Sequence, residues 1–130
     1  MSSKSLIMRA FNTNFFELID AIISYFPEKS IFKTAKTNME LLKKTNPTIL
    51  IKVWLSNVYT PYSEEINNGD VHFFINKDYS NDLKDAQEQN KIIDFINEMR
   101  NNVMELPDSS KNRIMSYVQN LSKMSVQYAL

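Results

Sequence analysis

Glycine occurs once in this chain of 130 residues, as Gly69. A β-hairpin usually turns on glycine or on Asn-Gly, because glycine takes positive φ without a steric cost. A helix needs at most one glycine, at its C-terminal cap. A chain this poor in glycine therefore favours helices, and 130 residues suit one domain with a buried core. We predict an all-α fold: a compact single-domain bundle of five or six helices over residues 1–130.

Apolar residues recur at helical spacing along most of the chain. The predicted helices cover residues 12–26, a stretch following Ser30, 47–60, 90–106 and 110–128, and a short helical turn ends at Gly69 as its C′ residue. The first helix carries too many apolar residues for one stripe, so we expect it to be central and mostly buried. The regular spacing in the last two helices predicts an antiparallel αα-hairpin.

Three segments carry weaker helical signals. Residues 1–5 are predicted to form a flexible N-terminus, and residues 76–89 an acidic surface loop. Residues 70–83 begin with a strand-like alternation of apolar side chains that also fits one or two helical turns. We favour helix there, because no partner strand is evident elsewhere in the chain.

Histidine also occurs once, as His72, and cysteine is absent. These two residue types supply most nucleophile–base pairs and transition-metal sites. Asp70 and Asp78 lie near His72 in the sequence, but two carboxylates and one histidine are a weak ligand set for a first-row metal. We therefore predict no enzymatic activity, no metal and no cofactor. A carboxylate-based enzyme stays open only if a pocket gathers acids such as Asp70 and Asp78.

Charge is unevenly distributed although the formal net charge is zero. Residues 1–52 carry net +4, residues 53–108 net −7, and residues 109–130 net +3. Five lysines recur in and around the helix that follows Ser30, with Lys52 as a further member: Lys29, Lys33, Lys36, Lys43 and Lys44. Such a row is either an ordinary solvated face or a surface for an anionic partner such as nucleic acid or an acidic protein.

Aromatic residues gather between positions 54 and 79 and are either core or interface residues. Tyrosine and tryptophan are enriched at interface hot spots because they bury a large area with little loss of entropy. Burial is the favoured interpretation for Trp54 and Phe73. The predicted partner-binding surface, an aromatic and acidic ridge, comprises Trp54, Tyr59, Tyr62, Asp70, Asp78 and Tyr79.

The middle of the chain resembles a family of small proteins encoded by large nucleocytoplasmic DNA viruses of algae and amoebae. The resemblance spans most of the chain and rests on these segments: Phe15-Phe16-Glu17, Phe26-Pro27, Thr34-Ala35-Lys36, the run from Lys43 to Pro47, Trp54, Pro61-Tyr62, the run from Asn68 to Tyr79, and the run from Tyr117 to Lys123. It implies a viral origin and carries over no activity.

Together these observations predict a non-enzymatic viral protein that acts in protein–protein interaction or as a structural component, for instance a minor virion or assembly protein. Its partners would be viral proteins or a second copy of itself, without membrane insertion. The alternative is a nucleic-acid-associated protein of the viral core or factory that uses the basic helix Lys29–Lys44. The expected location is inside the host cell, in the cytoplasm or viral factory, and packaging in the virion is left open.

Overall fold

The structure, a computed structural model, describes residues 3–70 and 87–130, with side chains described over 3–70 and 91–130. Every regular element of the described chain is a helix, which confirms the predicted all-α class. Its elements, in order, are α1 (Ser3–Tyr25), α2 (Ser30–Thr45), α3 (Ile49–Val53), the π-helix η1 (Trp54–Tyr59), the 3₁₀ helix η2 (Thr60–Tyr62), α4 (Ser63–Asn67), α6 (Gln87–Val103) and α7 (Asp108–Ala129).

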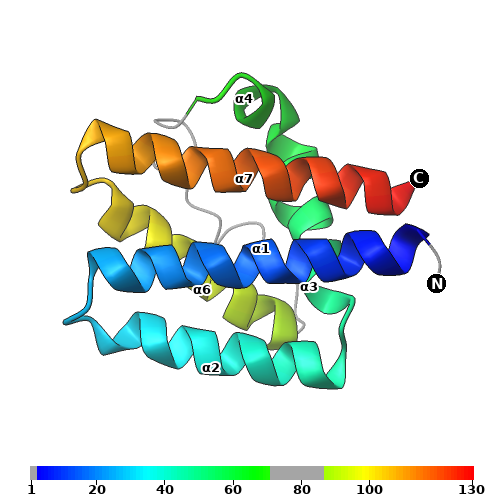
Figure 1. The fold of residues 1–130 in the computed structure, drawn as a ribbon, viewed down its shortest axis with the longest axis horizontal. Helices are drawn as coiled ribbons and strands as arrows, with labels where there is room; N and C mark the ends of the chain where they lie inside the picture. Colours follow the sequence, from blue (N-terminus) through cyan, green and yellow to red (C-terminus); the bar gives the residue numbers. More distant parts are fainter. Residues whose placement is uncertain (1–2, 71–86) are drawn as a thin grey trace.

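Three long helices lie side by side, with α1 between α2 and α7 (Figure 1). Behind them pass α6, which packs against α2, and the α3–η1 segment, which packs against α7. The two ends of the described chain lie at the same end of the molecule (Figure 1). The core is therefore a slab between the front three helices and the elements behind them.

The first helix is longer than predicted. It begins at Ser3 rather than near Asn12, so residues 3–5 belong to its first turn and not to a flexible terminus. Its position is central as expected, because α1 contacts α2, α3 and α7. It is not buried all round, however: Thr13, Glu17 and Asp20 form an exposed outer strip. The many apolar residues of α1 pack against its three neighbouring helices, α2, α3 and α7, and they do not require that the helix be surrounded on all sides.

The last two helices are consecutive and joined by a short turn, as predicted, but they do not form a closely packed pair. From their join α6 crosses toward α2, while α7 lies along α1 (Figure 1). The α1–α7 pairing is the most extensive helix contact in the described chain. Sequence spacing predicted amphipathic helices correctly, but it could not tell which neighbour each apolar face would meet.

Four buried aromatic rings fill the centre of the core. Phe15 of α1 packs edge-to-face against Trp54 of η1 at 6.3 Å and against Phe95 of α6 at 5.8 Å between ring centroids. Phe11 stacks near Phe15 at 6.1 Å and also meets Trp54 at 6.1 Å. Edge-to-face pairs at these separations are the favoured geometry for aromatic side chains. Three elements far apart in the sequence are thus held by one aromatic cluster.

Residues 49–67 form one helical run whose hydrogen-bond pattern changes along its length. The backbone N–H of Thr60 donates to the carbonyl of Leu55, five residues earlier, so the helix widens into a π-turn before Pro61. Proline has no N–H and its ring clashes with the carbonyl four residues earlier in an α-helix. The π-turn followed by a 3₁₀ turn accommodates Pro61, so the chain changes pitch at the end of the helix predicted over residues 47–60.

Gly69 ends this run as predicted. Its φ is +69°, its N–H donates to the carbonyl of Ile66 at 3.0 Å, and the N–H of Asp70 donates to the carbonyl of Glu65 at 2.9 Å. These two bonds define the Schellman motif, in which C′ adopts a left-handed conformation that glycine takes without strain. Apart from Asp70, the predicted helix at 70–83 lies outside the described residues, as does most of the predicted loop at 76–89, although 87–89 belong to α6.

Candidate functional site

Trp54 does not belong to a surface ridge. Its side chain is fully buried, and its indole Nε1–H donates a hydrogen bond of 3.0 Å to Oγ of Ser122 on α7. The Ser122 hydroxyl in turn donates to the backbone carbonyl of Val118 at 2.7 Å. This buried chain of hydrogen bonds satisfies the indole inside the core. The place of Trp54 in the predicted partner-binding surface is therefore wrong, and its favoured interpretation as a core residue is confirmed.

The rest of the predicted ridge is only partly brought together. Tyr59 is half-buried, and its hydroxyl accepts a hydrogen bond of 2.8 Å from Nδ2 of Asn67. Tyr62 is half-buried against the core, and Asp70 is exposed beside Gly69. The remaining candidates lie outside the described residues, together with the histidine considered as a metal ligand: His72, Asp78 and Tyr79.

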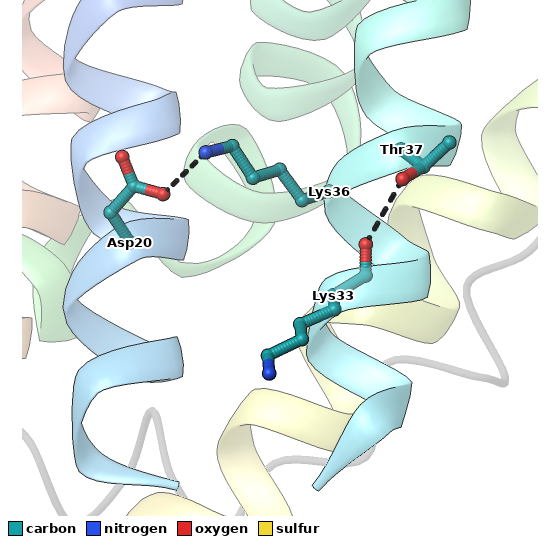
Figure 2. A network of polar contacts seen from close by, with 4 residues as sticks. All are labelled: Asp20, Lys33, Lys36 and Thr37. Atoms are coloured by element: carbon teal, nitrogen blue, oxygen red, sulfur yellow. Dashed lines mark hydrogen bonds and ion pairs between the residues drawn. The ribbon is translucent and has the colours of Figure 1, made fainter. Parts of the chain in front are cut away.

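The lysines of α2 do share one side of the helix, but several of them are held against neighbouring groups. Lys36 reaches from α2 to Asp20 of α1, with 2.8 Å between Nζ and Oδ1 (Figure 2). The hydrogen bond to Asp20 raises the pKa of Lys36 above its usual value, aided by the charges of Asp20 and Glu40. Glu40 lies one helical turn from both Lys36 and Lys44, so its negative charge reduces the net positive charge of this face.

Two other lysines rest on aromatic rings. The ammonium of Lys43 lies 5.2 Å from the ring centroid of Phe16, and that of Lys29 lies 5.9 Å from the ring centroid of Phe26. A cation over an aromatic face is attracted by the ring quadrupole. Lys33 and Lys44 are exposed, and in the described chain neither ammonium has an ion-pair or ring partner. These two form what we call the basic edge of α2.

A groove between α2 and α6 was not foreseen. It has a volume of about 290 Å³ and opens to solvent. Its floor is apolar and includes the buried rings of Phe32 and Phe95, and its rims are largely polar. The residues that line it are Ile31, Phe32, Thr34, Ala35, Asn38, Lys91, Asp94, Phe95, Asn97 and Glu98.

The two rims of the groove differ in chemistry. On α2 the rim includes Ile31, which is 45% exposed. On α6 the rim carries Asp94 and Glu98, one helical turn apart and without an ion-pair partner in the described part of the chain. We call these two carboxylates the acidic edge of α6. Sequence reasoning missed the groove because its walls are about sixty residues apart in the chain.

Comparison of the chain with protein-family models, with curated proteins and with solved structures finds no match to any of the three. Within residues described with side chains, no three histidine, cysteine, aspartate or glutamate residues gather closely enough to hold a metal ion. None of the described helices combines the length and the apolar character that crossing a membrane requires.

Proposed function

We propose that this chain is a non-enzymatic domain that binds another protein through the groove between α2 and α6. The observation that carries the proposal is the exposed side chain of Ile31 at the rim of a groove that opens to solvent and has the buried rings of Phe32 and Phe95 at its floor. A helix that lays an apolar face into a groove uses such a floor for affinity. Charged and amide groups at the rim then fix the orientation of the partner and exclude water from the centre.

The polar rim supports a protein partner rather than an anionic polymer. Asp94 and Glu98 face the groove beside Lys91, so the lining presents both signs of charge. A phosphate backbone would be repelled by the two carboxylates, whereas a protein surface can present lysine or arginine to them. Binding through this groove would therefore combine apolar contact with a few ion pairs.

Nucleic-acid association through the lysines of α2 remains a prediction with less support. Lys33, Lys43 and Lys44 are exposed, which favours it, but Glu40 lies among them and Asp20 already neutralises Lys36. A binder of this kind would lose affinity steeply as salt concentration rises. The viral setting, whether virion or factory, likewise stays a prediction that rests on the resemblance of the sequence.

Site-specific photo-crosslinking tests the proposed binding surface. A photoreactive phenylalanine analogue would replace Ile31 at the groove and, as a matched control, Asn120 on the exposed side of α7. Irradiation of cells that express each variant should give protein adducts from position 31 and few from position 120, because position 31 lies at the proposed binding groove and position 120 lies on a different helix, away from it. Absence of protein adducts at position 31, or equal labelling at both positions, would overturn the proposal.

A further inference from the structure

A stripe of mostly exposed side chains runs along α2 beside the groove. Its members are spaced by three and four residues, as on the contact face of a coiled coil, and are Ile31, Thr34, Asn38, Leu41 and Thr45. Leu41 is 57% exposed and Ile31 is 45% exposed, and both rank among the large apolar side chains that the described surface leaves uncovered. The stripe therefore has apolar residues toward both ends and polar residues between them.

The stripe is flanked by opposite charges. On the side away from α6 lies the basic edge, Lys33 and Lys44, and on the other side lies the acidic edge, Asp94 and Glu98. In the described chain none of these four side chains is engaged in an ion pair. By contrast, Lys36 forms an ion pair with Asp20, and the carboxylate of Asp20 offsets its positive charge. The surface thus carries two unpaired edges whose charges complement each other.

We propose that the partner bound at this surface is a second copy of this chain, which packs its own α2 stripe against the stripe beside the groove about a two-fold axis parallel to α2. A two-fold axis in this direction exchanges the two flanks of the stripe. Lys33 of each protomer then faces the acidic edge of its partner, which lies beside residues 31–38 of α2, and the stripes meet in register. A two-fold axis across α2 would instead bring like charges together, which is unfavourable. This inference rests on the proposed function and names the partner of that site.

The side chains along the stripe fit such a contact. Ile31 and Leu41 supply apolar area at two points along the pair of α2 helices, while Asn38 and Thr34 sit between them. A polar residue within an apolar seam lowers stability and fixes register and orientation. Since the seam is short and half polar, the expected self-association is weak, in the micromolar range or weaker.

Paired charge reversals test the arrangement by sedimentation equilibrium. One variant, Lys33→Glu with Lys44→Glu, makes both edges acidic, and a second, Asp94→Lys with Glu98→Lys, makes both edges basic. The wild-type protein should dimerise reversibly as its concentration rises. Each variant alone should dimerise about tenfold more weakly or worse, because like charges then face each other, and an equimolar mixture should regain dimers near the wild-type affinity.

Controls separate this proposal from misfolding and from the proposed function. Lys123→Glu on α7 should leave dimerisation unchanged, and circular dichroism of every variant should match the wild type. Wild-type protein that stays monomeric into the millimolar range, or a mixture that forms no heterodimer, would overturn the proposal. If the adducts at position 31 all have the mass of a different protein, self-association is wrong and the groove still binds protein. If position 31 gives no protein adduct, the proposed function fails as well.

Discussion

Trp54 and Ile31 are both large apolar side chains on helices, yet the fold treats them in opposite ways. Trp54 is fully buried in the aromatic cluster with its indole hydrogen-bonded, whereas Ile31 is 45% exposed at the rim of the groove. For Trp54 the sequence favoured burial but also allowed a partner contact, and the structure places this residue in the core. The comparison shows that residue type indicates only that a side chain can make extensive apolar contacts. Which elements pack around the side chain decides whether it is buried in the core or exposed to solvent.

The two regions should respond differently to substitution for the same reason. In the interior, a change removes contacts that the folded state always makes, so it lowers the free energy of unfolding. On the α2 surface, a change removes few intramolecular contacts, so its main effect should fall on binding. Three predictions test this contrast, from the largest effect on stability to the smallest.

Trp54→Ala should lower the free energy of unfolding by about 3–5 kcal/mol, because it removes a buried ring that contacts Phe11 and Phe15 and leaves a cavity. Ile31→Ala, the matched surface change, should cost less than about 1 kcal/mol, since almost half of that side chain is already in water. Denaturant unfolding followed by circular dichroism measures both. Similar losses for the two variants would contradict the contrast between core and surface.

Ser122→Ala should cost about 1–3 kcal/mol, since it leaves the buried indole N–H of Trp54 without an acceptor. The double variant Trp54→Phe with Ser122→Ala removes both partners of the hydrogen bond. The double variant should therefore lower the free energy of unfolding by less than the sum of the losses for Trp54→Phe and Ser122→Ala measured separately. This double-mutant cycle gives the coupling energy of the two side chains. Strictly additive costs would mean that this hydrogen bond contributes nothing to the stability of the core.

Asp20→Asn should lower the pKa of Lys36 toward its usual value, because the hydrogen bond and charge of Asp20 raise it. Since the folded-state pKa is raised, the ion pair stabilises the fold below the ordinary lysine pKa. That stabilisation disappears as the pH rises through the folded value. Both side chains are substantially exposed, so we expect less than about 0.5 kcal/mol at neutral pH.

NMR titration of the lysine side chains in the wild type and in Asp20→Asn checks this pKa difference directly. Lys33 provides the internal reference, because its exposed ammonium has no ion-pair partner in the described chain. An unchanged Lys36 titration in Asp20→Asn, or an equal change at Lys33, would show that the ion pair does not persist in solution.

Local sequence signals determined the helical class and the end of the helical run at Gly69. Both follow from rules that act within a few residues: apolar side chains at helical spacing need a buried side, and a Schellman cap needs a residue that accepts positive φ. The change of pitch before Pro61 also has a local cause, because proline lacks an N–H, although the sequence did not indicate a π-turn.

The tertiary structure alone decided which surfaces met. Helix α7 packs along α1 rather than closely against its sequence neighbour α6, and this placement brings Ser122 to the indole of Trp54. Placing α6 against α2 likewise creates the groove and leaves Ile31 at its rim. An amphipathic helix carries its apolar stripe in its own sequence, but the identity of its neighbour depends on the packing of the whole chain. For that reason the sequence determined the helices of this protein, and the fold decided its core contacts and its candidate binding surface.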